Sequence, residues 1–187
     1  MISERITSRA TDKRNQITGK VIIGKNVKIG INTVINGPCY IGDNVIIGAN
    51  NVLRGPLDLE SGVTTGAFTE IKNCLIGKDT HIHSGYFGDS IVGENCRIGA
   101  GFTSANRRIN RDNIFSSVKG QATDTKLTSF GCVIGSGSRL GVNVSTMPGV
   151  FIGRNAVIGP GTIVKENVED NTTYYSEFKI IKKKNNA

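Results

Sequence analysis

The sequence is poor in residues that mark several common protein classes. It has no Trp, only 4 Pro, and an aromatic content of 6%. No apolar run approaches the length of a membrane span. The 4 cysteines form no pair at metal-ligand spacing, and no signal peptide precedes them. We therefore expect reduced, buried cysteines in a cytoplasmic protein, and neither a membrane protein nor a disulfide scaffold.

Glycine and positive charge are in excess. The 187 residues include 24 Gly, and 23 Lys and Arg against 15 Asp and Glu give a net charge of +8. Part of this charge is a run at Lys182, Lys183 and Lys184, which we interpret as a solvated end. The remainder suits an anionic partner. Nucleic acid is not favoured, because aromatic residues are few and no groove-reading motif occurs.

An apolar residue followed by a position that is mostly Gly returns every six residues across most of the chain. The clearest stretch is VIIGKNVKIGINTVINGPCYIGDNVIIGANNVLRGP, from Val21 to Pro56. A helix needs apolar residues at a spacing of about 3.6, and a strand needs alternation over about four residues or more. Neither explains a strict period of six. One short strand plus one corner does, and three such sides close a triangular turn of 18 residues.

This repeat predicts an all-β solenoid in which stacked turns pair as in a parallel sheet. The apolar position of each hexad should face the core, and glycine should free the backbone for corner geometry. The steps shorten to five residues around Phe87, which marks an irregular place. The expected hexad starts are Ile23, Ile29, Ile35, Ile41, Ile47, Leu53, Leu59, Thr65, Ile71, Ile76, Ile82, Phe87, Val92, Ile98, Ser104, Ile134, Leu140, Thr146, Ile152, Ile158 and Val164.

The repeat indicates a single domain, 1–187, with one long interruption. We expect an N-terminal lead over 1–20, coils over 21–104 and 133–168, and a C-terminal tail over 169–187. The interruption, 105–132, carries several Arg and Lys. A structureless loop of this length is uncommon in a compact domain unless it has a role, so we interpret it as a protruding loop that reaches a ligand or a neighbouring subunit. A flexible surface excursion is the alternative.

Arg54, Lys72 and His83 occupy hexad positions where Gly is usual. Arg54 and Lys72 are one 18-residue turn apart, so the stacked coil should place them about 5 Å from each other. Two cations at that separation repel, and a bound phosphate would remove the repulsion, since Arg grips it through paired hydrogen bonds and Lys adds a point charge. Two solvated side chains that splay apart are the alternative.

His83 should lie on a different side of the coil, with Gly66 and Gly99 stacked beside it. A lone histidine is more often structural than catalytic, but Tyr86 and the shortened hexads close by favour a functional place. His81 should face the same way as His83. We expect no metal, because there is no third His and no carboxylate at ligand spacing.

The chain resembles the C-terminal acetyltransferase domain of the bifunctional N-acetylglucosamine-1-phosphate uridylyltransferase/glucosamine-1-phosphate acetyltransferases, and related sugar-1-phosphate nucleotidylyltransferases. The resemblance is carried by VLRGP, EIKN, HSGYFGDSIVGENCRIGAGFTSAN, VIGSGSRLGVNVSTMPGVFIG and VIGPGTIVKENV. It implies a left-handed parallel β-helix and a homotrimer with sites shared between subunits. Handedness rests on the resemblance alone, because parallel crossovers are usually right-handed.

The same resemblance implies acetyl transfer from acetyl-CoA to the amine of an amino-sugar 1-phosphate such as glucosamine-1-phosphate. It assigns the sugar phosphate to Arg54 and Lys72, the general base to His83, and substrate positioning to Tyr86 and Asn106. A neutral imidazole suits proton removal from the amine near pH 7. The amine attacks the thioester directly, so no cysteine nucleophile is needed.

Two features depart from the family. Where relatives have a basic cluster after Asn106, this chain reads RRINRDNIFSSVKG, and LTSFGC replaces a lysine before the last coils. The residues that bind CoA therefore stay unassigned, although the last coils, 134–168, should form the wall of its site. The nucleotidylyltransferase domain is also missing, and no glycine-rich phosphate loop is present. We expect no nucleotidyl transfer from this chain, which is either an independent enzyme or a fragment.

Two other functions stay open. Many coils of this type are non-catalytic oligomerisation or regulatory domains of sugar-1-phosphate nucleotidylyltransferases. The acetylated amine could also belong to a different compound, such as a nucleotide-linked amino sugar. A purely structural coil has no reason to keep Arg54, Lys72, His83, Tyr86 and Asn106 together, so this set favours an enzyme.

Overall fold

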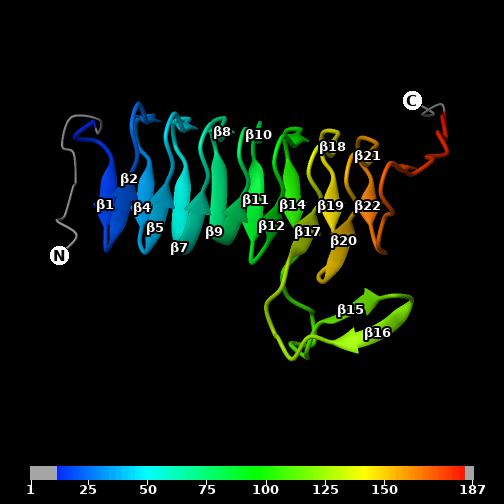
Figure 1. Ribbon diagram of the computed structural model, residues 1–187. Helices are drawn as coiled ribbons and strands as arrows, with labels where there is room; N and C mark the ends of the chain where they lie inside the picture. Colours follow the sequence, from blue (N-terminus) through cyan, green and yellow to red (C-terminus); the bar gives the residue numbers. More distant parts are fainter. Residues whose placement is uncertain (1–11, 184–187) are drawn as a thin grey trace.

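The six-residue repeat folds as a column of stacked triangular turns, as predicted. The computed structural model describes residues 12–183, so the start of the N-terminal lead and Lys184 lie outside the described residues. Strands of successive turns pair in parallel, and the column runs straight from its N-terminal to its C-terminal end (Figure 1). Within residues 12–183, no helix has the length and apolarity that a membrane crossing requires.

Each turn has three sides, and equivalent sides stack into three faces. The first face holds β1 (Gln16–Thr18), β4 (Val34–Asn36), β11 (Gly85–Gly88), β14 (Phe102–Ser104), β19 (Ser145–Thr146) and β22 (Ile163–Val164). The second holds β2 (Val21–Ile23), β5 (Cys39–Ile41), β12 (Ile91–Val92), β17 (Cys132–Ile134) and β20 (Val150–Ile152). The longer β7 (Val52–Leu59) and β9 (Thr69–Ile76) run around the corner between these two faces.

The third face is a separate 8-stranded sheet. Its strands are β3 (Lys28–Ile29), β6 (Ile46–Ile47), β8 (Thr64–Thr65), β10 (His81–Ile82), β13 (Arg97–Ile98), β18 (Arg139–Leu140), β21 (Val157–Ile158) and β23 (Thr173–Tyr174). The first and second faces form one 13-stranded sheet, because β7 and β9 belong to both.

The strand register confirms the predicted stacking. Ile35 pairs with Leu53 and Leu53 with Ile71, each 18 residues on, whereas Ile71 pairs with Phe87, only 16 residues on, where the hexads shorten. Every predicted hexad start from Ile35 onward is at most 4% exposed. The apolar positions therefore fill the inside of the prism, as the period of six predicts.

The second-position glycines have a different role from the one predicted. No second-position glycine in the described residues has a positive φ. A Cβ on Gly48 would instead lie 2.5 Å from the carbonyl group of Gly66 in the next turn. The left-handed corner residues lie two positions further on and are mostly Asn or Gly, such as Asn44 (φ 60°) and Gly62 (φ 75°). Glycine therefore supplies corner geometry at positions such as Gly62, as predicted, whereas second-position glycines permit close stacking of turns instead.

The coil extends beyond the predicted range at both ends. β1 already pairs in parallel with β4, so stacking begins before Val21. At the other end, β23 pairs with β21 beyond Val168. Ile17 and Tyr174 pack against the core from these outer strands. Both apolar residues were missed because the strict glycine pattern stops before it reaches them.

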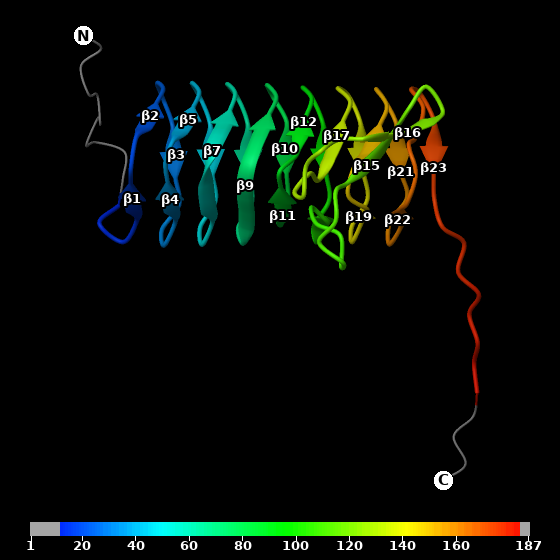
Figure 2. The same cartoon turned by 90° about the horizontal axis from the view of Figure 1, so that it is seen from below.

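The interruption between β14 and β17 forms an arm that leaves the column (Figure 1). The arm is not structureless, since β15 (Phe115–Val118) and β16 (Gln121–Asp124) pair as an antiparallel hairpin. This hairpin lies along the last turns of its own coil (Figure 2), where Ser116 Oγ donates to the Gly149 carbonyl at 2.8 Å. Asn167 Nδ2 likewise donates to the Ser117 carbonyl at 2.8 Å. The arm is thus a folded element that contacts its own chain.

Candidate functional site

The predicted site residues lie at two corners of the first face. Arg54 and Lys72 lie where β7 and β9 turn onto the second face, and Asn106 follows β14 at the same edge. We call this edge the arginine corner. His83 follows β10, at the edge shared with the third face, which we call the histidine corner. Tyr86 lies on β11 between the two.

Arg54 and Lys72 are partners in the strand register, as the 18-residue spacing predicts. Each, however, already has a carboxylate partner. Arg54 Nη2 donates to Glu70 Oε1, and Lys72 Nζ lies 3.0 Å from both carboxylate oxygens of Asp89. The expected repulsion is therefore offset within the chain without a bound anion. Neither carboxylate was predicted from the sequence.

The two ion pairs differ in exposure. The side chains of Arg54 and Glu70 are 44% and 38% exposed, whereas those of Lys72 and Asp89 are 30% and 6% exposed. An exposed pair contributes only about 0–1 kcal/mol, so Glu70 is easily exchanged for another anion. The Nε of Arg54 is buried and has no hydrogen-bond partner among the described residues. Since only Nη2 has a partner within residues 12–183, the partly exposed guanidinium keeps Nη donors for a ligand, whereas the buried Nε lies out of reach.

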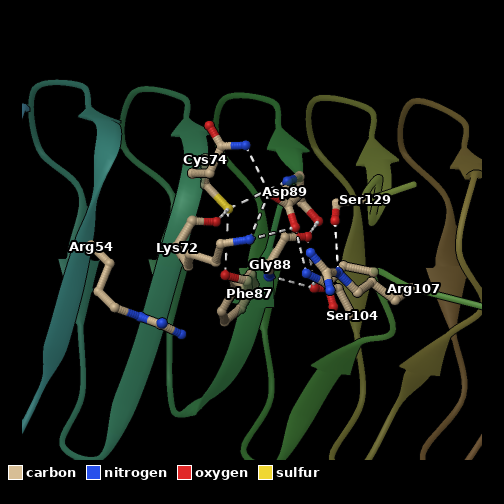
Figure 3. Close-up of polar contacts among 12 residues, drawn as sticks. Arg54, Lys72, Cys74, Phe87, Gly88, Asp89, Ser104, Arg107 and Ser129 are labelled. Atoms are coloured by element: carbon tan, nitrogen blue, oxygen red, sulfur yellow. Dashed lines mark hydrogen bonds and ion pairs between the residues drawn. The ribbon is translucent and has the colours of Figure 1, made fainter. Parts of the chain in front are cut away.

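Asp89 lies at the centre of the arginine corner (Figure 3). Besides the Lys72 contacts, Asn73 Nδ2 donates to its Oδ1 at 2.7 Å, and Asn106 Nδ2 donates to its Oδ2. Burial by itself raises the pKa of Asp89, but hydrogen bonds from Asn73, Asn106 and Lys72, with the charge of Lys72, outweigh burial and hold the pKa below its usual value. The carboxylate is therefore ionised at neutral pH.

Tyr86 reaches the same corner. A Cβ placed on Gly88 would lie 2.6 Å from the Tyr86 hydroxyl oxygen and 2.7 Å from Asn106 Nδ2. Gly88 thus allows Tyr86 and Asn106 to approach each other above β11. The structure therefore brings together Lys72, Tyr86 and Asn106, with Arg54 in register beside Lys72.

The structure keeps His83 apart from this cluster. Its side chain is exposed, and backbone hydrogen bonds set it between Gly66 and Gly99, as predicted. Strand β11 (Gly85–Gly88) runs between His83 and the arginine corner, since His83 comes before its first residue and Gly88 is its last. The two corners thus lie at opposite edges of the first face, and one chain alone does not join them.

A groove of about 570 Å³ runs along the third face from the histidine corner toward the last coils. Its lining includes His81, His83, Arg97 and Arg139, together with second-position glycines and Pro160. His81, Arg97 and Arg139 are consecutive partners in the strand register. Neither arginine pairs with a carboxylate among the described residues. The groove therefore combines two positive charges with glycines whose backbone no side chain of their own covers.

The cysteines take no part in either corner as nucleophiles. All four are free and buried, as predicted. Burial raises the pKa of Cys39 to about 11 and, as the largest cause, that of Cys74 to about 12. Both thiols therefore stay protonated at neutral pH, and a protonated thiol is a poor nucleophile.

Family models match the coils on both sides of the arm. The bacterial transferase hexapeptide (six repeats) matches residues 20–55, and the hexapeptide repeat of succinyl-transferase matches residues 131–166. The chain is 37% identical over 122 residues to the bifunctional protein GlmU of Methanococcus vannielii, covering 65% of this chain and 29% of that protein.

Two other relatives cover more of the chain. A bifunctional sugar-1-phosphate nucleotidylyltransferase/acetyltransferase of Sulfurisphaera tokodaii is 38% identical over 164 residues, which are 87% of this chain and 40% of that protein. The chain thus spans less than half of either bifunctional relative. YaiX of Escherichia coli K12, named as an uncharacterised acetyltransferase, is 38% identical over 159 residues, 84% of this chain and 69% of that protein. The chain belongs to the hexapeptide-repeat transferase family, and its column is the left-handed parallel β-helix of that family.

Proposed function

We propose that the protein is an acetyl-CoA-dependent N-acetyltransferase that acts on an amino-sugar 1-phosphate such as glucosamine-1-phosphate. The observation that carries this proposal is the arginine corner. Lys72, Tyr86 and Asn106 meet there around one buried carboxylate, with Arg54 stacked beside Lys72. A coil that served only for assembly has no need of such a polar cluster. The name of the Sulfurisphaera tokodaii relative, which pairs sugar-1-phosphate nucleotidylyltransferase with acetyltransferase, supports the same chemistry.

The arginine corner suits a sugar phosphate. The guanidinium of Arg54 is partly exposed, and its only hydrogen bond among the described residues is the one that Nη2 makes to Glu70. Each charge-assisted bond to a phosphate oxygen contributes about 1.5–3 kcal/mol, against about 0–1 kcal/mol for the exposed Glu70 pair. A dianionic phosphate would therefore replace Glu70 on Arg54 and add to the bonds of Lys72.

The groove on the third face suits acetyl-CoA as the co-substrate. It begins at His83 and continues over the last coils, where the sequence analysis places the wall of the CoA site. Its glycines allow a thin acyl-pantetheine chain to approach the backbone closely, and Arg97 and Arg139 offer positive charge to the phosphates of CoA. The thioester would then lie close to the histidine corner.

In the proposed reaction, the neutral sugar amine attacks the thioester carbonyl. A C–N bond forms, the C–S bond breaks, and CoA leaves as the thiolate. The imidazole of His83 takes the proton that the amine loses and passes it to the thiolate or to water. Because His83 and the arginine corner lie at opposite edges of one chain, we propose a homotrimer in which His83 of one copy faces the arginine corner of another.

A thiol-release assay with acetyl-CoA and a panel of amines tests the proposal. The panel contains glucosamine-1-phosphate, glucosamine and a nucleotide-linked amino sugar. We expect the highest kcat/KM for the sugar 1-phosphate, because only it places a dianionic phosphate on Arg54 and Lys72. Preference for the nucleotide-linked sugar would favour the other acceptor class. Absence of thiol release with every amine would favour a non-catalytic assembly module.

A further inference from the structure

Lys72, Asp89 and Asn106 lie in three consecutive turns, and their hydrogen-bonded side chains form a polar ladder. Asp89 follows Lys72 by 17 residues, and Asn106 follows Asp89 by another 17. Both carboxylate oxygens are fully used: Oδ1 accepts from Lys72 and Asn73, and Oδ2 accepts from Lys72 and Asn106. With only 6% of its side chain exposed, Asp89 has no free acceptor to offer a substrate. Its role must act through its neighbours.

The arm begins and ends on this ladder. It leaves the coil at Asn106, whose side chain binds the Asp89 carboxylate. It returns at Gly131, whose N–H donates to the Asp89 carbonyl at 2.9 Å, and the neighbouring Phe130 N–H donates to the Asn106 carbonyl at 2.9 Å. A Cβ on Gly131 would lie 2.1 Å from the Gly88 carbonyl oxygen, so the returning chain packs directly against the residue before Asp89.

We propose that Asp89 is a positioning residue that couples the arm to the sugar-phosphate site. Its carboxylate holds the Lys72 ammonium and the Asn106 amide in one fixed arrangement. Substrate contact through Lys72 and attachment of the arm at Asn106 then depend on a single side chain. The part that concerns the substrate rests on the proposed function, whereas the attachment of the arm does not.

The chemistry of the ladder explains why a carboxylate is required. Lys72, Asn73 and Asn106 all present N–H donors, so the central group must accept at both of its oxygens. Asp89→Asn keeps the shape but turns one acceptor into a donor that faces another donor. The variant also removes the negative charge beside Lys72. Asp89→Asn therefore tests the arrangement with the smallest change in volume.

The kinetic test compares Asp89→Asn, Lys72→Ala and the double variant. We expect Asp89→Asn to raise KM for glucosamine-1-phosphate about ten-fold, with kcat and KM for acetyl-CoA nearly unchanged. Since Asp89 acts through Lys72, adding Asp89→Asn to Lys72→Ala should change KM by less than about two-fold. Asp43→Asn is the matched control, because Asp43 also bonds an adjacent turn, through the Lys25 N–H at 2.6 Å, far from the ladder. Fully multiplicative effects, or equal effects on both substrates, would overturn the substrate part.

Amide hydrogen exchange tests the attachment of the arm without any need for activity. The Phe130 amide should exchange about ten-fold faster in Asp89→Asn than in wild type, and remain unchanged in Asp43→Asn. If Asp89→Asn does not fold, Asn106→Ala removes the arm side of the ladder alone and should release the same amide. Unchanged exchange would overturn the coupling. Faster exchange in a protein that acetylates none of the amines would retain the coupling and reject the proposed function.

Discussion

The two corners of the first face are built in opposite ways. At the arginine corner, Lys72 and Asn106 are held by a carboxylate whose side chain is 6% exposed. At the histidine corner, His83 is exposed and lies between Gly66 and Gly99. The groups assigned to recognition are therefore fixed before any ligand binds, which lowers the entropy lost on binding. The group assigned to proton transfer is left open, so that other molecules or copies can approach it.

Removal of the exposed His83 imidazole should have the largest effect on activity. His83→Ala is expected to lower acetyl transfer by about 100-fold or more while the column stays folded, because the proposed proton acceptor for the amine is lost. Steady-state thiol release and thermal unfolding measure the two properties separately. His81→Ala, on the same strand, is the matched comparison and should lose far less. Turnover equal to wild type in His83→Ala would show that the histidine corner has no catalytic role.

Removal of either cation at the arginine corner should weaken recognition of the phosphate only. Arg54→Ala or Lys72→Ala is expected to lower kcat/KM for glucosamine-1-phosphate by about ten- to a hundred-fold. The kcat/KM for glucosamine, which has no phosphate for these cations to bind, should be almost unaffected. The informative quantity is the ratio of kcat/KM for the two substrates. If both fall by the same factor, the cations do not recognise phosphate.

Mixed oligomers test whether the two corners meet between copies. His83→Ala and Lys72→Ala should each have much lower activity than wild type when assembled alone. Oligomers assembled from equal amounts should regain about a quarter of wild-type sites, because each shared site draws one corner at random from each of two copies. Light scattering checks the assembly against the monomer mass of 20.0 kDa. A stable monomer, or no regain of activity, would rule out a shared site.

The groove beside the histidine corner predicts a smaller effect. Arg139→Gln is expected to raise KM for acetyl-CoA about five- to ten-fold through the loss of one contact to phosphate. S-acetylpantetheine, which lacks the nucleotide phosphates, should show no such change. Lys28→Gln is the control, since Lys28 lies on the same face at the far end of the column. Equal effects on both thioesters would place the CoA phosphates elsewhere.

The smallest expected effect concerns acid stability. The folded-state pKa of Asp89 is lowered, so its contribution to stability is present above its unfolded pKa, near 4, and is lost as the pH falls through the lower folded value. Asp89→Asn should therefore have a lower Tm than wild type at pH 7. That difference should shrink as the pH falls below about 4. Melting curves across this range decide the matter, and a difference independent of pH would contradict it.

The six-residue period was sufficient to predict the core and the alignment of Arg54 with Lys72. A period of six places Ile35, Leu53 and Ile71 in one buried column, and the same count aligns Arg54 with Lys72. These predictions succeed because register in a stacked coil follows directly from residue number. The separation of His83 from the cations followed from the same count.

The partners of the cations could not be found in this way. Glu70 lies 16 residues from Arg54 and Asp89 lies 17 from Lys72, so a count of 18 aligns neither. Whether corner side chains meet depends on the shortened hexads and on side-chain direction, which periodicity does not contain. The role of second-position glycines was missed for a related reason, since a clash such as that at Gly48 depends on the distance between turns.

The arm joins the column at a point where the column is already continuous. Thr103, before the arm, pairs directly with Ser145, after it, and Ile91 pairs with Val133. The turns on either side therefore stack as neighbours whatever the intervening chain contains. The arm can therefore change in length or sequence, and so change what contacts the site, while the strand pairing of the column stays intact. New specificities can thus arise in this fold by replacing the segment between Asn106 and Gly131 without redesign of the core.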